Sequence, residues 1–504
     1  MTDRAKIKLM GSVRKIIGNT AIQILGKFAT AVLSIIVIKL ITGYLGRAGY
    51  GEYTVIYEFL AFFGIIADFG IFQIAVKEMS MHPANRNKIF GNILTMRAVL
   101  ACVAMVAAVS AGFLIPKYAN TAIPLGIAIA SVTTLLTLIF GTLSSLLQVA
   151  LKMQWSVLAF VLGKIATLAW IIFVVKFWLP NNPTTGFFQL LIAGIIGGIV
   201  MVTLTFFAAR RLEKFSLRFD FQFWREIFVK TLPYGMAILL ATIYFRIDVI
   251  LLSLMRSNDE VGVYGVAARI LENLSIISIF FLNSALPTIT RLFRDNHEKL
   301  KKLLQYSFDF LMMIGVPIVV GGITLAYPLI TAISSPKFAS DLTNGFYGSD
   351  IALQILLVAM LFAFLANLFG YTLLAGNQQI KLLWINSAAV IFNFVSNLLV
   401  IPIWGFRGAA ITSVASQIFV CIFGFYFVRQ LIQIRFTFTT LTKIILAAGV
   451  MYILIRILEP ILCETFGSNT NLLILILFGG TAYGTTLLIT KAVTPEMRQL
   501  IARK

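Results

Sequence analysis

Polar side chains interrupt the apolar segment at 16–42, and their spacing suggests anion chemistry. They recur at helical intervals, so they share one face of a helix. The stripe consists of Asn19, Gln23, Lys27, Thr30 and Ser34. A lysine inside an apolar segment is costly unless water or an anion meets its charge. The stripe therefore either lines a hydrated cavity or bonds a neighbouring helix.

A second group of residues could bind an anion such as phosphate. Thr242 and Arg246 lie one helical turn apart, and a guanidinium grips phosphate oxygens with two hydrogen bonds. The alternative for Arg246 is an internal salt bridge. Three amides recur at steps of seven and four in the segment 381–403 and share a face: Asn386, Asn393 and Asn397. They either line a cavity or only bond adjacent helices.

Two carboxylates, Asp68 and Asp309, lie further toward the ends of apolar segments. Either could bind a coupling proton or sodium ion during transport of a solute. Each could instead pair with a buried cation, for which Arg97 and Lys164 are the candidates.

The elements that position these groups must be membrane helices. The chain is 59% hydrophobic and 12% charged, with a mean hydropathy of +0.94, outside the range of soluble domains. Fourteen segments are long enough to cross the hydrocarbon core of a bilayer. They are 16–42, 50–76, 93–115, 120–149, 153–178, 187–209, 231–255, 261–290, 303–332, 350–375, 381–403, 408–429, 441–458 and 470–490.

Basic residues predict the orientation of these helices. With the N-terminus inside, the inner segments hold 28 Lys and Arg residues and the outer segments hold six. Positive loops resist translocation, so both termini are expected in the cytoplasm. The first helix lacks a small-residue cleavage site and is expected to stay uncleaved. This excess of basic residues in the inner loops explains the net charge of +21. Nucleic-acid binding is not expected, because the sequence has no solvated basic domain.

The two halves of the chain resemble each other, which indicates a duplication. An offset of 211 matches Thr20, Gly51, Tyr53 and Val55 with Thr231, Gly262, Tyr264 and Val266. An offset of 229 later matches Gly141, Lys152, Trp155, Ala159 and Val161 with Gly370, Lys381, Trp384, Ala388 and Val390. Because each copy has an even number of helices, both copies enter the membrane in the same direction. The predicted pseudo-two-fold axis therefore runs along the membrane normal.

The duplication also pairs Glu58 with Arg269 at one depth, and Glu272 continues the Arg269 face. We predict a Glu58–Arg269 salt bridge that closes the outer side of a cavity between the halves. The predicted architecture is an all-α integral membrane protein of about fourteen transmembrane helices. It consists of a six-helix lobe at 1–210, an interfacial cytoplasmic linker at 211–230, a second lobe at 231–432 and an extra two-helix hairpin with a tail at 433–504. The alternative for the linker is an ordinary loop.

Catalytic, metal and nucleotide sites are not expected. Three cysteines and two histidines are scattered over separate segments, which does not suit a zinc site or disulfide framework. No Walker-type loop is present. The sequence therefore predicts no enzyme and no cofactor.

The segment 16–71 resembles the start of Wzx-type oligosaccharide flippases, the polysaccharide transporters. The motifs LGRAGYGEY, Leu45–Tyr53, and ADFGI, Ala67–Ile71, are similar to that family's first two helices, and FRIDVILLS with EVGVYGVAARI to the matching part of the second half. The resemblance covers nearly the whole chain. It implies the fold of the superfamily that includes multidrug antiporters and lipid II flippases, two six-helix bundles around a central cavity.

The resemblance implies a polyprenyl diphosphate carrying a short glycan, moved from the inner to the outer leaflet of the cytoplasmic membrane for O-antigen or capsule-like polysaccharide synthesis. Lys27, Lys164 and Arg246 would receive the diphosphate, and the Asn and Thr faces would bond the sugars. Implied partners are membrane lipid, a glycan polymerase and other assembly proteins. The alternatives are a cation-coupled multidrug or metabolite antiporter and a lipid II flippase.

Overall fold

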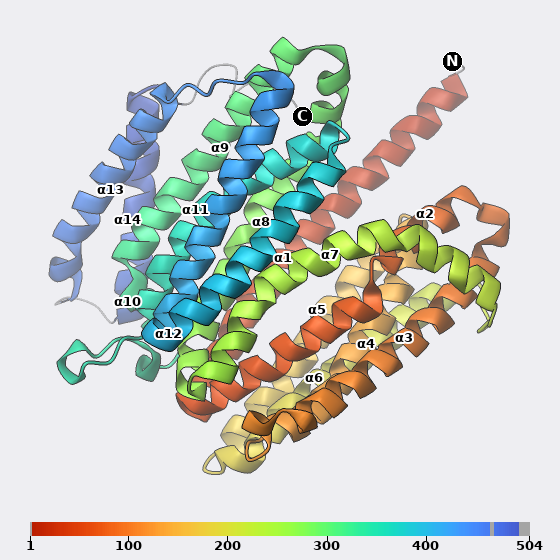
Figure 1. Ribbon diagram of the computed structural model, residues 1–504, viewed down its shortest axis with the longest axis horizontal. Coiled ribbons are helices and arrows are strands. Elements are labelled where there is room, and N and C mark those ends of the chain that lie inside the picture. Colours follow the sequence, from red (N-terminus) through yellow and green to blue (C-terminus); the bar gives the residue numbers. More distant parts are fainter. Residues whose placement is uncertain (1–2, 464–467, 493–504) are drawn as a thin grey trace. The chain divides into compact units, whose positions relative to one another are not determined.

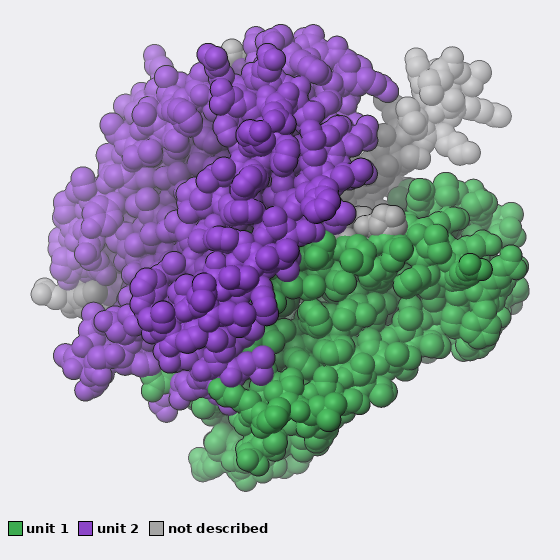
Figure 2. All heavy atoms as spheres, viewed as in Figure 1, with its two compact units in different colours: residues 1–250 green, residues 251–504 purple. Residues whose placement is uncertain are grey.

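The computed structural model describes residues 3–463 and 468–492. Side chains are described from Ile22 onward, except at 24, 233–234, 237–238, 241, 245, 463 and 468. The chain forms two compact units, Met1–Ile250 and Leu251–Lys504 (Figure 2). We call them unit 1 and unit 2. The division falls inside a helix, whereas the sequence suggested a linker at 211–230.

Unit 1 is built from α-helices (Figure 1). These are α1 (Asp3–Asp68), α2 (Ile71–Met81), α3 (Arg86–Leu114), α4 (Ile123–Val149), α5 (Met153–Phe173), α6 (Pro183–Arg210) and most of α7 (Phe221–Met255). Helix α1 packs against α3, α4 and α5, and α6 packs against α4 and α5. A π-helical turn, Val174–Trp178, extends α5.

Unit 2 begins at Leu251, within the last turns of α7. Its helices are α8 (Asn258–Asp295), α9 (His297–Thr324), α10 (Ala326–Ile333), α11 (Ser349–Ala375), α12 (Gln379–Ile432), α13 (Thr439–Cys463) and α14 (Ser468–Ile489). Helix α11 lies at the centre, because it packs against α8, α9 and α12. The extra hairpin of α13 and α14 packs on α9, where the Tyr483 hydroxyl donates a 2.7 Å hydrogen bond to the Met313 carbonyl.

The helices account for the fourteen predicted crossings. Within the described ranges, eleven helical stretches are long and apolar enough to cross a membrane. Helices α1 and α12 have 66 and 54 residues, enough for two crossings each. They are broken at Gly46 and Gly405, whose φ angles are +69° and +57°. Helix α7, with 35 residues, supplies a further crossing. The predicted all-helical membrane fold is confirmed.

Two predicted spans are not continuous helices. The span at 50–76 is interrupted at Phe69 and Gly70, which have φ angles of +40° and +75°. The span at 303–332 is interrupted at Leu325, between α9 and α10. Apolar residues continue through both breaks, so hydropathy gives no sign of them. Short helices α2 and α10 result.

The two halves share local geometry. Gly46 breaks α1, and Ser257, which is 211 residues later, caps the start of α8. After α4 and after α11 the chain makes the same turn, with a left-handed residue at Leu151 and at Asn377. In each turn the next amide bonds a carbonyl five residues back at 2.8 Å, as in a Schellman motif. These turns are 226 residues apart, so the offset of 229 misaligns them by three.

The segment between α6 and α7 is anchored to unit 1. Thr95 of α3 donates to the Arg218 carbonyl, and Arg86 forms a 2.9 Å salt bridge with Glu213. Ile227 belongs to the same buried hydrophobic cluster as Phe90 of α3. Helix α7 begins at Phe221, before the predicted start at 231. The connection is therefore a packed part of the unit.

Candidate functional site

The polar stripe of α1 presents a charged group at its centre. Lys27 is exposed within unit 1 and Gln23 is half-buried. The Thr30 hydroxyl donates to the Lys27 carbonyl at 2.9 Å, and the Ser34 hydroxyl donates to the Thr30 carbonyl at 2.8 Å. These hydroxyls are satisfied by their own helix and keep lone pairs free to accept. The side chain of Asn19 lies outside the described residues.

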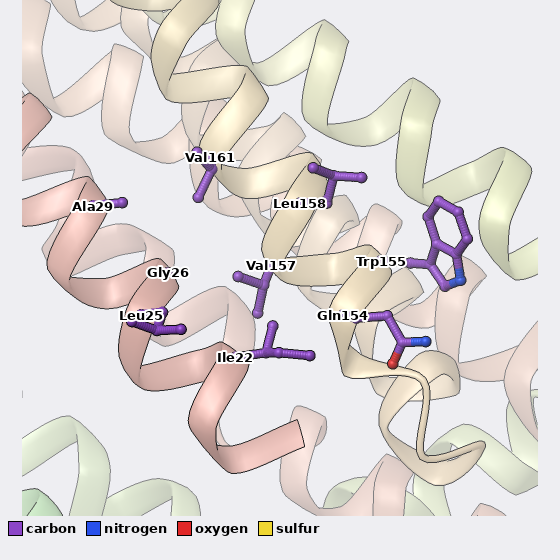
Figure 3. A pocket seen from close by; sticks show the side chains of 9 residues that line it. All are labelled: Ile22, Leu25, Gly26, Ala29, Gln154, Trp155, Val157, Leu158 and Val161. Carbon is purple, nitrogen blue, oxygen red and sulfur yellow. The ribbon is translucent and has the colours of Figure 1, made fainter. Parts of the chain in front are cut away.

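A pocket of about 460 Å³ lies between α1 and α5. Its lining is almost entirely apolar: Ile22, Leu25, Gly26, Ala29, Gln154, Trp155, Val157, Leu158 and Val161. Figure 3 shows Ile22 and Val157 in the space between the two helices. Most of these side chains cannot bond a polar group, so the pocket suits a hydrocarbon chain.

Lys27 follows Gly26 in the chain but does not line this pocket, because it lies on another face of α1. It also lies nearer to one end of the span than the sequence suggested. A Cβ atom added to Gly26 would lie 2.2 Å from a methyl group of Val157, so the two helices touch there. Val157 is only four residues, or about 6 Å, from the start of α5 at Met153. Gly26 therefore lies at the depth of the first turns of α5, near the N-terminal end of that helix. The apolar run at 16–42 did not show this, because α1 continues as a helix before it.

Lys164 follows the pocket along α5. It lies seven residues after Val157 and three after Val161, so all three share one face of the helix. Lys164 is exposed, and its Nζ atom lies 5.7 Å from the centre of the Phe160 ring. Lys164 thus extends the face of α5 that lines the pocket.

Arg246 pairs with a carboxylate inside unit 1. Its guanidinium donates to Glu58 on the second part of α1. The Glu58 side chain is 8% exposed and that of Arg246 is 24% exposed. Thr242, one turn earlier on α7, is buried. Arg246 therefore has the salt bridge that the sequence left open, and its guanidinium still reaches the surface of the unit.

Asp68 pairs with Arg97 at the end of α1. Arg97 is buried, and it also donates a 2.9 Å hydrogen bond to the hydroxyl of Thr142 on α4. This contact ties α1, α3 and α4 together. The structure thus shows Asp68 paired with a buried cation, which is one of the two alternatives that the sequence left open.

The predicted gate residues of unit 2 bond within that unit. Arg269 forms a 2.8 Å salt bridge with Glu272, one turn along α8. Asp309 is buried, and it accepts a 3.0 Å hydrogen bond from Gln305, which also binds the backbone of Thr437. Asp309 thus supports the segment before α13. The Glu58–Arg269 pair would join the two units and stays a prediction.

The amide face of α12 bonds mainly within unit 2. Asn397 donates to Asn393 at 3.1 Å, and Asn393 donates to Ser416 in the second part of the same helix at 3.3 Å. Both asparagines are buried, whereas Asn386 is half-buried. Asn393 and Asn397 therefore bond helix to helix, and Asn386 is the member of the group with an accessible side chain.

The charges of unit 1 favour an anion. Glu58 and Asp68 each have an arginine partner, which reduces their capacity to bind a cation. Lys27 has no ion pair among the residues that the structure describes. An exposed ammonium that has no carboxylate partner in the described part of the chain can receive a negatively charged group.

The sequence analysis missed the pocket residues of α5, above all Val157 and Trp155. A usable signal was present in α1, where Gly26 and Ala29 lie one turn apart. Small residues at this spacing mark a close approach of two membrane helices. The partner helix could not be read from this spacing, because it lies more than 120 residues away in the chain.

Solved structures with similar folds are membrane transporters. The lipid II flippase MurJ in an inward closed conformation has a TM-score of 0.72 at 15% identity, covering 96% of this chain and 100% of its own. An inward-facing multidrug resistance MATE family transporter of the MOP superfamily has a TM-score of 0.61 at 16% identity, covering 80% of this chain and 94% of its own. At these identities the likeness shows the fold.

Sequence comparisons identify the family. An uncharacterized membrane protein of Methanocaldococcus jannaschii is 27% identical over 227 residues, and the match spans 42% of this chain and 42% of that relative's length. Residues 233–399 match the MatE family. Residues 16–293, more than half of the chain, match the family described as polysaccharide biosynthesis protein. The resemblance seen in the sequence is thereby confirmed, and the chain belongs to the polysaccharide biosynthesis protein family of multi-pass membrane flippases and transporters.

Proposed function

We propose that this protein flips a polyprenyl-diphosphate-linked oligosaccharide from the inner to the outer leaflet of the cytoplasmic membrane, for polysaccharide biosynthesis. Two observations carry the proposal: the apolar pocket between α1 and α5, and the exposed Lys27 on another face of α1, which has no ion pair among the described residues. A prenyl chain suits the pocket, and a diphosphate suits the ammonium. Lys164, on the same face of α5, and Arg246 are further groups for the diphosphate.

Transport by alternating access needs an energy source, and the membrane potential suffices in principle. Each negative charge that moves outward through an inside-negative potential gains roughly 2.3 kcal/mol per 100 mV. The diphosphate carries such charges, whereas a neutral glycan does not. The proposed cycle therefore uses no nucleotide and no covalent step, and the protein acts as a transporter without catalysis. A glycan polymerase and other assembly proteins are the proposed recipients.

A cation-coupled antiporter is the second candidate, favoured by the MatE match at 233–399. Such a transporter needs carboxylates that can bind a cationic drug, a proton or sodium. The arginine partners of Glu58 and Asp68 make these two acids less suitable. A lipid II flippase would differ from our proposal mainly in the glycan.

The test uses the full chain in vesicles that contain fluorescent polyprenyl-diphosphate-linked oligosaccharide. Transport is scored as the fraction of glycan that an enzyme added outside can modify. Lys27→Gln should lower the transport rate at least about tenfold, because a charge-assisted contact to phosphate is lost. Lys39→Gln is the matched control, since it removes the same charge from the same helix and should retain the rate.

Two outcomes would contradict the proposal. Wild-type vesicles could leave the glycan lipid unflipped under an imposed potential, or Lys27→Gln could transport as fast as Lys39→Gln. Potential-independent export of a cationic dye by the same vesicles would favour the antiporter instead.

A further inference from the structure

A second cavity, of about 500 Å³, lies in unit 2 where α8 and α11 both end. Its wall includes Arg291 and Arg294 from the last turns of α8, and Asn377 from the turn after α11. None of these residues belongs to the candidate site of unit 1. The cavity also lies apart from the amide face of α12 described above.

Backbone geometry builds the wall of this cavity. A Cβ atom added to Gly376 would lie 2.6 Å from the ring of Phe293, so the ring packs directly on the glycine. Asn377 has a φ angle of +56°, a conformation that asparagine tolerates better than most residues. The turn is closed by the Gln378 amide, which donates to the Leu373 carbonyl at 2.8 Å. The cavity is thus a shaped site and not a gap between mobile side chains.

The cavity carries uncompensated positive charge. Arg291 has no ion pair among the described residues. Arg294 lies 3.4 Å from Asp295, but their side chains are 85% and 50% exposed, so water screens this pair. The nearby carboxylate of Glu298 is held by Lys301 at 2.8 Å. The side-chain amide of Asn377, for which the described part of the chain offers no hydrogen bond, adds a polar group to the wall.

The surroundings place this cavity at the level of lipid headgroups. Ile380 and Trp384, on the first turns of α12 just after Asn377, are 73% and 72% exposed within the protein. An exposed Trp beside an exposed aliphatic residue is typical of the boundary between hydrocarbon and headgroups. Arginine there meets phosphates without being drawn into the hydrocarbon.

We propose that this cavity binds the phosphate of an anionic lipid headgroup. Arg291 and Arg294 grip its oxygens, and the Asn377 amide donates a further hydrogen bond. The phosphate can come from a bilayer lipid, such as phosphatidylglycerol, or from a polyprenyl diphosphate that waits at the membrane surface. The proposal needs only the membrane fold and does not depend on the flippase function proposed above.

The test measures binding of fluorescent lipids to the purified full chain in detergent. The probes are phosphatidylglycerol, a polyprenyl diphosphate and, as a zwitterionic comparison, phosphatidylcholine. Arg291→Gln/Arg294→Gln should weaken binding of the anionic probe at least about tenfold, since two charge-assisted contacts are lost. Lys299→Gln/Lys302→Gln removes the same charge from the adjoining start of α9 and should change the affinity less than about twofold.

The probe whose binding weakens in the arginine double variant identifies the source of the phosphate. Dependence for phosphatidylglycerol identifies a bilayer lipid, and dependence for the diphosphate alone identifies the polyprenyl carrier. Asn377→Asp should also weaken binding, whereas Asn377→Gly should keep the turn. A purely structural role is the competing explanation, because arginine near the C-terminal end of a helix interacts favourably with the helix dipole. In that case the arginine variants would lower Tm without changing the preference for anionic probes.

Three results would overturn the proposal. Phosphatidylcholine could bind as tightly as the anionic lipids, the two double variants could lose affinity equally, or a folded arginine variant could retain full affinity. Because no transport enters the measurement, each of these would leave the flippase proposal standing.

Discussion

Arg246 on α7 donates a hydrogen bond to the carboxylate of Glu58 on α1, 188 residues earlier in the chain. Nine residues separate Arg246 from the end of α7, and twelve separate Glu58 from the break at Gly46. At 1.5 Å per residue both side chains lie well inside the hydrocarbon. The pair therefore fastens α7 to unit 1 at a depth where an unpaired charge is costly.

We expect removal of either partner to destabilise the protein. Glu58→Gln and Arg246→Gln should each lower the free energy of unfolding by about 1–3 kcal/mol, because a charge is left uncompensated. The double variant should recover most of this loss, since no charge remains. Thermal unfolding of the purified protein measures the effect. Transport should stay low in the double variant, because the guanidinium that we propose to bind phosphate is missing. Recovery of both stability and transport would mean that the pair is purely structural.

The contact between α3 and the segment before α7 can be tested with one methyl group. A Cβ atom at Gly91 would lie 2.2 Å from the Ser216 carbonyl oxygen, so Gly91→Ala must displace that backbone. We expect a lower Tm, by a few degrees, and faster tryptic cleavage at Lys214 and Arg218. Gly449→Ala in α13 is the control, because its Cβ would have no neighbour within 4 Å. Unchanged cleavage in Gly91→Ala would disprove the close packing.

The loop around Asp341 should respond to acid. Hydrogen bonds from Thr343 and Asn344 hold the pKa of the exposed Asp341 carboxyl below its ordinary value of 3.8. These contacts are complete above that ordinary value and are lost as the pH falls through the lowered pKa. Hydrogen exchange at 341–346, corrected for its intrinsic pH dependence, should therefore accelerate in strong acid. Asp341→Asn should abolish this response, and an equal response in both proteins would contradict it.

The predicted orientation can be checked by labelling single cysteines in intact cells. Cysteine at Asn85 or Asn296, in predicted inner loops, should react with an impermeant maleimide only after permeabilisation. Cysteine at Ala119 or Thr343, in predicted outer loops, should react at once. The basis is the excess of Lys and Arg in the inner segments. The opposite labelling pattern would contradict both the predicted topology and the proposed direction of transport.

The sequence predicted the number of crossings because each apolar run must match the thickness of the hydrocarbon. It could not predict the break at Phe69 and Gly70, since apolar residues continue on both sides and only the backbone changes direction. The offset of 229 was wrong at the shared turn for a similar reason. That offset was chosen from a few identical residues. The position of the shared turn depends instead on backbone conformation and hydrogen bonds at Leu151 and Asn377, which the sequence does not display.

The candidate site was predicted less completely. Periodicity identified the faces that carry Lys27, Arg246 and Asn393, because residues one or two turns apart share a side of a helix. It could not choose between ligand and partner, since that choice depends on distant groups. In the structure these groups are Glu58 for Arg246 and Ser416 for Asn393, and a role of either residue in binding substrate stays a prediction.

The anchored segment before α7 also constrains the order in which the chain can mature. Ile227 completes the buried cluster around Phe90, and Lys230 holds Glu78 of α2 at 2.9 Å. While the ribosome is still making α6, that cluster lacks part of its wall. The first half therefore cannot reach its final packing as an independent nascent domain, and it must wait in the membrane until α7 has been inserted.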